Sequence, residues 1–189
     1  MWKTTANKDF RYLYSMRIFL IGFMGSGKST VGERLAALEQ LSFADLDQLI
    51  EKKEQKKISE IFSISGEQHF RILEEQMLNE WISQNQSGIL ACGGGTPCFG
   101  ENMEKMRQNG ITVYLEVDEE NLAKRLHYDR ESRPLLKNLS PDELLHDISK
   151  RLQSRLPFYR KAQISVNAIG TPDRVAVHIH QQLNTWRAQ

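Results

Sequence analysis

The sequence predicts one α/β domain, built on a parallel sheet with helices on both faces. Two observations carry this prediction. Short apolar runs alternate with segments of helical periodicity, and the run at 17–21 is followed at once by a glycine-rich motif and a helix. A chain of 189 residues with no repeat or linker fits a single domain. We expect 16–189 to form it, preceded by a loosely structured N-terminal extension at 1–15.

Apolar runs and capping signals place the individual elements. The expected strands are 17–21, 41–44, 88–92, 111–117 and 164–166. The expected helices are 28–40, 47–64 with a break near Lys56, 65–83, 101–109, 118–126, 140–161 and a last one capped by Thr171.

Helical spacing puts Val31, Leu35 and Leu38 on one face of the helix expected at 28–40. Ser140, followed by proline and then by glutamate at the third helical position, is a strong start signal. The helix that follows is expected to bend or break at Pro157, because proline removes a backbone donor.

Charge and cysteine content exclude several classes of protein. With 25 basic and 24 acidic residues the formal net charge is +1, which gives no strong attraction for nucleic acid or an anionic membrane. The apolar runs are far shorter than the ~18 residues of a membrane span, and no secretory signal is visible. Two cysteines are too few for a disulfide framework, so we expect a reduced, cytoplasmic protein.

Residues 22–29 match the pattern G-x-x-x-x-G-K-[ST] between an expected strand and an expected helix. Such a loop turns backbone N–H groups inward around phosphate, and the helix adds its positive N-terminal end. We expect Lys28 to reach the β- and γ-phosphates and Ser29 to ligate Mg²⁺. The expected ATP contacts in this loop are Gly25, Ser26, Gly27, Lys28, Ser29 and Thr30.

The motif alone leaves kinase, GTPase, ATPase and motor open. No Asn-Lys-x-Asp element for guanine follows it, and the chain is small for a motor. These features favour a small-molecule kinase. The charged, aperiodic stretch 127–139 is then a candidate lid.

An acceptor site is expected at the carboxyl ends of the strands. Asp45 and Asp47 follow the second strand, where one carboxylate could serve Mg²⁺ and the other a hydroxyl; a plain helix cap is an equal alternative. Gly93, Gly94 and Gly95 follow the third strand and permit close approach of a ligand to the backbone. Taken alone, Arg71 and Arg155 fit ordinary surface arginines.

From Met16 onward the chain resembles the shikimate kinases. The segments that carry the resemblance are 22–30, 45–47, 65–71, 92–95, 133–136 and 155–159. The resemblance implies a five-stranded fold of the nucleoside-monophosphate-kinase type. It also implies ATP- and Mg²⁺-dependent phosphorylation of the 3-hydroxyl of shikimate, in aromatic amino-acid biosynthesis.

The resemblance also assigns roles to single residues. Asp47 contacts the acceptor hydroxyls, Arg71 and Arg155 clamp the carboxylate, and Gly94 adds backbone contacts, flanked by Gly93 and Gly95. Arg133 reaches the transferring phosphate, and Arg125, with Arg130 as the alternative, packs on adenine. We assign Ser29 and Asp45 to the metal and Lys28, Asp47 and Arg133 to catalysis.

Two rival functions remain open from the sequence. One is another small-molecule kinase, of the gluconate or nucleotide type. The other is a nucleotide-dependent switch or binding module without an acceptor. We expect a monomer that binds shikimate, and neither nucleic acid nor membrane.

Overall fold

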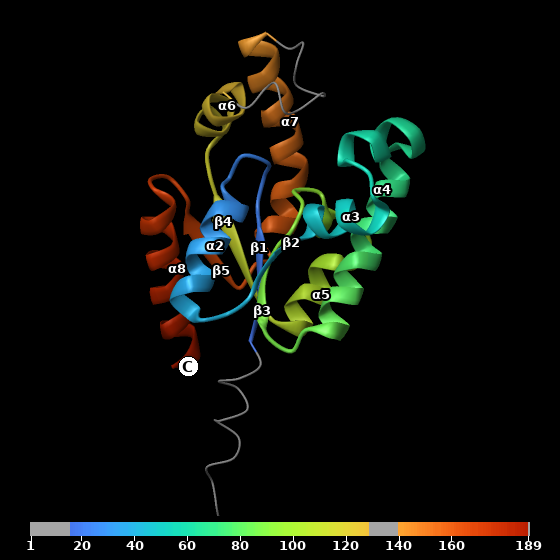
Figure 1. The fold of residues 1–189 in the computed structure, drawn as a ribbon. Coiled ribbons are helices and arrows are strands. Elements are labelled where there is room, and N and C mark those ends of the chain that lie inside the picture. Colours follow the sequence, from blue (N-terminus) through green and yellow to red (C-terminus); the bar gives the residue numbers. More distant parts are fainter. Residues whose placement is uncertain (1–15, 129–139, 189) are drawn as a thin grey trace, which may run out of the picture.

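The structure is a computed structural model that describes residues 16–128 and 140–188, and it contains a five-stranded parallel sheet between helices (Figure 1). The strands are β1 (Arg17–Ile21), β2 (Phe43–Asp45), β3 (Gly88–Ala91), β4 (Ile111–Glu116) and β5 (Ile164–Asn167). They confirm the predicted strands, with ends moved by one or two residues. The extension expected at 1–15 lies outside the described residues.

Strand β1 lies at the centre of the sheet order β2-β3-β1-β4-β5. Leu20 of β1 is opposite Ala91 of β3 on one side and Val113 of β4 on the other. Helices cover both faces, which explains why the run Ile18–Ile21 is entirely apolar and entirely buried. The chain crosses from one side of β1 to the other after β3, and the carboxyl edge at such a crossing is where ligands bind in open α/β sheets.

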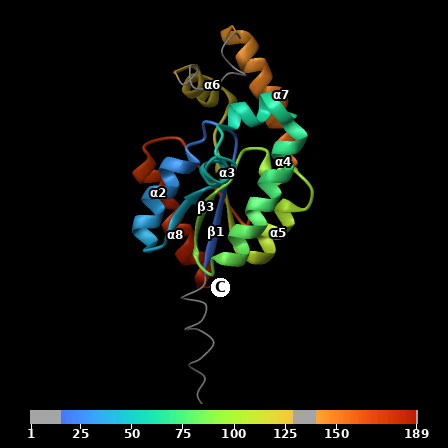
Figure 2. The same cartoon turned by 45° about the vertical axis from the view of Figure 1, so that its right-hand side comes forward.

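The helices form two outer layers and a projecting pair. They are α2 (Lys28–Glu39), α3 (Leu46–Glu54), α4 (Ile58–Gln84), α5 (Asn102–Asn109), α6 (Glu119–Tyr128), α7 (Pro141–Tyr159) and α8 (Pro172–Arg187), with a short 3₁₀ turn η1 (Thr96–Cys98). Helices α2 and α8 cover one face of the sheet, and α4 and α5 cover the other (Figures 1 and 2). Helix α6 and the first part of α7 pack together beyond the carboxyl edge of the strands, and the last part of α7 descends to the sheet, where Tyr159 stacks on Tyr114 of β4.

The predicted helix starts at Ser140 and Thr171 are confirmed. The Ser140 hydroxyl accepts a hydrogen bond from the Glu143 amide, and the Glu143 carboxylate accepts one from the Ser140 amide at 2.7 Å. Thr171 accepts from the Arg174 amide at the start of α8. Within the described ranges, no helix combines the length and apolarity needed to cross a bilayer.

The helix start expected at Ser65 is confirmed, because α4 (Ile58–Gln84) consists of two helices that meet at Gly66, where φ is 78° and ψ 173°. One other expectation about helices needs correction. Helix α7 runs through Pro157 to Tyr159 instead of breaking there, because the fully buried Tyr159 ring anchors its end. Leu38 is 45% exposed, because the buried arc of α2 (Val31, Gly32, Leu35, Ala36) lies to one side of it.

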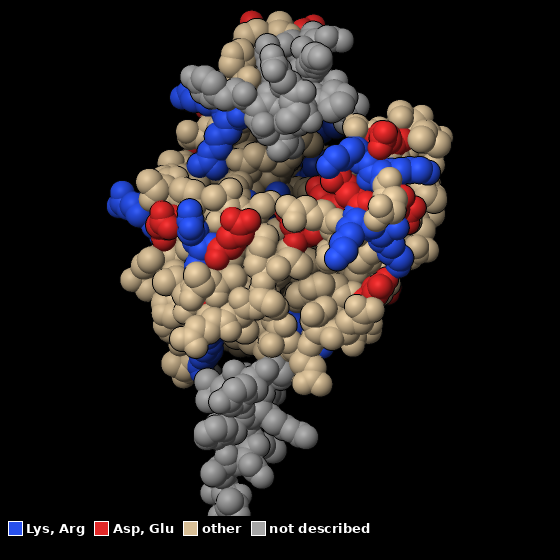
Figure 3. All heavy atoms as spheres, in the orientation of Figure 1, with Lys and Arg blue, Asp and Glu red and all other residues tan. Residues whose placement is uncertain are grey.

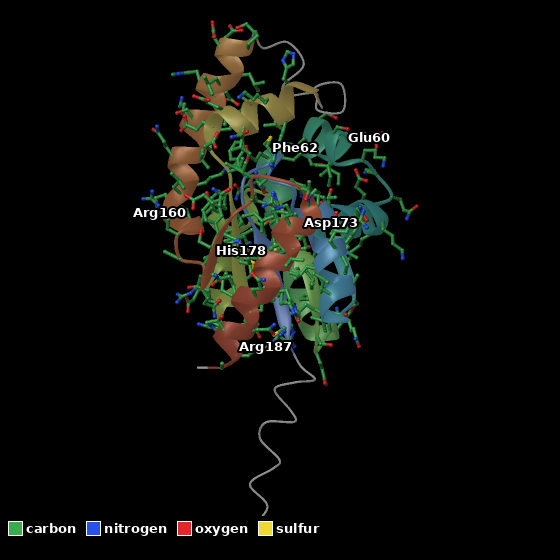
Figure 4. All side chains as sticks on the ribbon, turned by 90° about the vertical axis from the view of Figure 1, so that its left-hand side faces the viewer. Glu60, Phe62, Arg160, Asp173, His178 and Arg187 are labelled. Atoms are coloured by element: carbon green, nitrogen blue, oxygen red, sulfur yellow. The ribbon has the colours of Figure 1, made fainter. Side chains whose placement is uncertain are left out.

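Glu39 at the end of α2 lies inside that buried arc and ties α2 to α8. Its side chain is only 4% exposed. It accepts hydrogen bonds from Arg187 at 2.5 Å and from Nδ1 of His180 at 2.7 Å. Both partners belong to α8, whose last turn carries Arg187 (Figure 4). A buried carboxylate is therefore neutralised by charge-assisted contacts from the neighbouring helix.

Candidate active site

The glycine-rich loop joins the end of β1 to the start of α2 at the carboxyl edge of the sheet. Gly27 caps α2 with φ 92°, a left-handed conformation that favours glycine. The Lys28 ammonium donates to the carbonyls of Gly22 at 3.0 Å and Phe23 at 2.9 Å. A hollow of about 240 Å³ opens over this loop and is lined by Gly25, Gly27, Lys28, Ser29 and Thr30 among others. The helix N-terminus and the ammonium together suit a phosphate chain.

Ser29 and Asp45 meet in the same hollow. The Ser29 hydroxyl donates to Oδ2 of Asp45 at 2.5 Å, so a serine oxygen and a carboxylate oxygen converge. The other oxygen, Oδ1, accepts from the amides of Asp47 and Gln48 and caps α3. Asp45 thus serves as a helix cap and still offers one oxygen beside Ser29. Oxygen donors of this kind are the ligands that Mg²⁺ prefers, so the pair fits the expected metal.

Asp47 lies in the first turn of α3 and borders the same hollow. Its Oδ1 atom is buried and makes no hydrogen bond with the described residues. Burial, together with the nearby charges of Glu74 and Asp45, raises its pKa to about 6, against the opposing effect of Lys28 and Arg71. A carboxylate with such a pKa can take a proton from a bound hydroxyl near neutral pH.

The triple glycine after β3 is the place where the acceptor residues converge. A Cβ on Gly93 would lie 2.3 Å from Oε1 of Glu74, and a Cβ on Gly95 would lie 2.4 Å from the guanidinium carbon of Arg71. A Cβ on Gly94 would lie 3.2 Å from NH1 of Arg155. Side chains that are distant in sequence therefore occupy the space that the three glycines leave free.

Arg71 is fixed by two carboxylates on its own helix, α4. Glu67 accepts from Nε and NH2, and Glu74 accepts from NH1 at 2.5 Å. Glu74 is fully buried, and its second oxygen accepts from the Thr96 hydroxyl at 2.5 Å. Sequence reasoning missed Glu74 and Thr96. The spacing of Arg71 and Glu74, three residues apart on one helix, was the available signal.

Arg155 reaches the site from α7. Its guanidinium carbon lies 5.3 Å from the centre of the Phe23 ring in the glycine-rich loop. Arg71 and Arg155 both line a second hollow, of about 400 Å³, which Gly95 also borders. Gly94 lines the first hollow together with Lys28. The two arginines therefore line one hollow. Gly95 borders this hollow and its neighbour Gly94 borders the hollow over the phosphate loop, so the two hollows adjoin at the triple-glycine turn.

Of the remaining predicted residues, the structure describes Arg125 but neither Arg130 nor Arg133. Arg125 on α6 donates to the carbonyls of Gly25, Ser26 and Ala168, so its guanidinium lies beside the phosphate loop. Its contact with adenine stays a prediction. Arg133, its neighbour Arg130 and the lid predicted at 127–139, apart from its first two residues, lie outside the described residues.

A parallel sheet with a phosphate loop at its centre, facing two arginines and a carboxylate of raised pKa, defines a P-loop phosphotransferase for a small acidic acceptor. The chain matches the sequence profile of the shikimate kinases over residues 24–184. It is 48% identical over 152 residues to the shikimate kinase of Parabacteroides distasonis, covering 80% of this chain and 87% of that one. The chain belongs to the shikimate kinase family.

Solved structures agree with this assignment. The shikimate kinase of Bacteroides thetaiotaomicron superposes with a TM-score of 0.84 at 37% identity, covering 89% of this chain and 98% of that one. The shikimate kinase of Acinetobacter baumannii, in complex with shikimate, gives 0.83 at 35% identity, covering 96% and 99%.

Proposed function

We propose that the two adjoining hollows bind ATP and shikimate side by side, with the triple-glycine turn between them. As a shikimate kinase, the enzyme transfers the γ-phosphoryl group of ATP to the 3-hydroxyl of shikimate, in the pathway to aromatic amino acids. The observation that carries the proposed arrangement is that Arg71 and Arg155 share one hollow next to the loop that holds Lys28.

On the ATP side, the backbone of Gly25–Thr30 surrounds the phosphates, and the Lys28 ammonium contacts the β- and γ-phosphate oxygens. Its contacts with Gly22 and Phe23 hold the ammonium at the mouth of the loop, within reach of a bound phosphate chain. Ser29 and Asp45, whose side-chain oxygens meet at 2.5 Å, would hold Mg²⁺ directly or through water. When bound, Mg²⁺ neutralises charge on the transferring phosphoryl group.

On the acceptor side, the guanidiniums of Arg71 and Arg155 hold the shikimate carboxylate. Planar guanidinium groups bind a carboxylate through parallel charge-assisted hydrogen bonds, which fix its orientation as well as its position. The backbone of Gly94 lies against Arg155 and that of Gly95 against Arg71, while Gly93 lies beside Glu74 and Asp47, so the turn can add contacts at close range. Fixing the carboxylate turns the opposite side of the ring, with its hydroxyls, toward Asp47.

Asp47 accepts the proton of the 3-hydroxyl as that oxygen bonds to the γ-phosphorus and the bond to ADP breaks. A late proton transfer is sufficient, because phosphoryl transfer through a loose transition state depends mainly on positioning and charge neutralisation. The raised pKa of Asp47, about 6, supports this role, since it makes the carboxylate a stronger base than an exposed aspartate.

Two further assignments, of Arg125 and Arg133, come from the resemblance, and a third, the lid, comes from the charged and aperiodic sequence of 127–139. Arg125 packs on adenine, which its position beside Gly25 and Ser26 supports. Arg133 stabilises charge on the transferring phosphate, and the segment 127–139 acts as a lid. The free thiols of Cys92 and Cys98 support a reducing, cytoplasmic location, and we propose that the enzyme acts as a monomer.

Arg71 and Arg155, the two arginines that hold the shikimate carboxylate, are called the clamp below. The decisive experiment replaces one of them. Arg71→Ala should raise the KM for shikimate at least about tenfold and leave the KM for ATP within about twofold, because each charge-assisted hydrogen bond is worth roughly 1.5–3 kcal/mol. Arg107→Ala on α5 is the matched control, because this exposed arginine pairs with Glu104 on its own helix. An unchanged shikimate KM in Arg71→Ala would contradict the clamp.

An acceptor panel separates the rival functions. Coupled release of ADP is measured with shikimate, quinate and gluconate as acceptors. The proposal requires turnover with shikimate to exceed turnover with gluconate. ADP release that does not depend on any acceptor would instead indicate a nucleotide-dependent switch.

A further inference from the structure

The triple glycine forms a turn whose central peptide is free to rotate unless something holds it. The Thr96 amide donates to the Gly93 carbonyl at 3.1 Å, which closes a four-residue turn around Gly94 and Gly95. Gly95 has φ −91° and ψ −17°, as the third residue of a type I turn does. Rotation of the central peptide gives a type II turn, which needs positive φ at Gly95 and which glycine accepts at little cost.

A buried hydroxyl holds that peptide. Tyr159 at the end of α7 donates its Oη–H to the Gly94 carbonyl at 2.6 Å. The Tyr159 side chain is fully buried and stacks on Tyr114 of β4, with ring centres 5.1 Å apart and planes at 29°. The hydroxyl therefore has a fixed position, because the ring cannot change rotamer inside a packed core. A rotated peptide would turn its N–H toward the hydroxyl and lose this hydrogen bond.

The same hydroxyl lies next to the second arm of the clamp. Arg155 precedes Tyr159 by one turn of α7, and its NH1 lies close to Gly94. Burial is the main cause that raises the pKa of Tyr159, and the charge and hydrogen bonding of Arg155 act against it, as expected for a guanidinium beside the phenol oxygen. Tyr159 thus contacts both the glycine turn and the arginine that the proposed function assigns to the carboxylate.

We propose that Tyr159 is a positioning residue for the acceptor: its hydroxyl locks the Gly94–Gly95 peptide and the adjacent Arg155 in the geometry that receives the shikimate carboxylate. The inference rests on the clamp of the proposed function. Tyr159 lines neither of the two hollows, so we expect its effect to reach the reaction through Gly94 and Arg155.

The test removes one oxygen atom. In Tyr159→Phe the ring stack remains and the Gly94 carbonyl loses its donor. The KM for shikimate should rise about five- to thirtyfold, since an unsatisfied buried acceptor costs roughly 1–2 kcal/mol. The KM for ATP should stay within about twofold, which a general loss of structure would not produce. Kinetics are measured well below the thermal midpoint of each variant, so that partial unfolding does not contribute.

Tyr114→Phe is the matched control, because it removes the hydroxyl of the other ring in the same stack, and the charged neighbours of that hydroxyl among the described residues are Glu116 and Arg160, which belong to neither the turn nor the clamp. It should leave both KM values unchanged. An unchanged shikimate KM in Tyr159→Phe, an equal rise in both KM values, or the same effect from Tyr114→Phe would overturn the inference.

A double-mutant cycle separates this inference from the proposed function. If Tyr159 acts through Arg155, Tyr159→Phe should change the shikimate KM less than about twofold when Arg155→Ala is already present. A full additional rise in that background would overturn the coupling. If neither Arg71→Ala nor Arg155→Ala alone raises the shikimate KM, the clamp itself fails. If the arginine variants raise the shikimate KM and Tyr159→Phe does not, only the positioning role of Tyr159 is rejected.

Discussion

Asp47 shows how burial, together with neighbouring charges, prepares a single residue for its reaction. Its raised pKa of about 6 means that the carboxylate is ionised at neutral pH but protonated in mild acid. The proposed proton acceptor must be ionised. We therefore expect kcat/KM for shikimate to be constant above about pH 7 and to fall tenfold per pH unit well below pH 6. A pH–rate profile measures this, and a flat profile down to about pH 5 would contradict it.

Replacement of Asp47 by asparagine should change stability and activity in opposite directions. The pKa of Asp47 is higher in the folded protein than its ordinary value of 3.8, so ionisation destabilises the fold as pH rises from about 4 to 6, and the penalty persists above that range. Asp47→Asn avoids this penalty. It should raise the free energy of unfolding at pH 7.5 by about 1–3 kcal/mol, less at pH 4, while kcat falls at least about a hundredfold.

Denaturant titrations at both pH values give the stability difference, and steady-state kinetics give the rate. An Asp47→Asn protein that is less stable than the parent at pH 7.5 would contradict the electrostatic origin of the shift. An unaltered kcat would exclude Asp47 as the proton acceptor.

Among the elements, α4 depends most on one residue. The interruption at Gly66 separates an outer segment from the part of the helix that carries Arg71 and Glu74. A Cβ at Gly66 would meet no atom within 4 Å, so any cost of substitution comes from its positive φ. Gly66→Ala should lower stability by roughly 1–3 kcal/mol and raise the shikimate KM, because the relaxed helix would reorient Arg71.

Gly170→Ala provides the comparison for this element. Gly170 also has positive φ and also has no atom within 4 Å of a Cβ, but it precedes α8, away from the acceptor residues. It should lower stability and leave the shikimate KM unchanged. Thermal unfolding gives the stability of both variants, and steady-state kinetics give their KM for shikimate. A raised shikimate KM in Gly170→Ala would contradict the specific role of Gly66 in positioning Arg71.

At the scale of the whole molecule, Glu39 is one of the links between α2, which follows the phosphate loop, and α8, in addition to the exposed pair Arg34–Asp173. Removing one partner of a buried ion pair leaves the others without compensation. Because Arg187 and His180 are about a third exposed, solvent screens part of this loss. Glu39→Ala should lower the free energy of unfolding by about 1–3 kcal/mol, with KM values unchanged while the protein is folded. An unfolding midpoint equal to that of the parent would contradict this.

Sequence patterns predicted the sheet well, because buried parallel strands such as β1 are continuous apolar runs that only one kind of fold accommodates. They predicted the phosphate loop well for a similar reason, since its chemistry is local. The acceptor side was different. Arg71 and Arg155 carry no local signal, and the family resemblance alone singled them out. Glu74 was missed because its burial depends on how α4 packs against the glycine turn.

Pro157 was misjudged for the same reason: the anchoring of Tyr159 against β4 depends on the assembled fold. The mixture of charges visible over α3 and α4 (Figure 3), with pairs such as Lys53–Glu80 and Lys57–Glu51, agrees with the balanced net charge read from the sequence.

The electrostatic link between Arg71 and Asp47 has a thermodynamic consequence. Arg71 lowers the pKa of Asp47 in the substrate-free protein. When an acceptor carboxylate neutralises that guanidinium, this influence weakens and Asp47 binds protons more readily. Shikimate binding near pH 6 should then draw a fraction of a proton from solution, so that its calorimetric heat varies with the ionisation enthalpy of the buffer. The substrate itself would thereby strengthen the base that receives its hydroxyl proton.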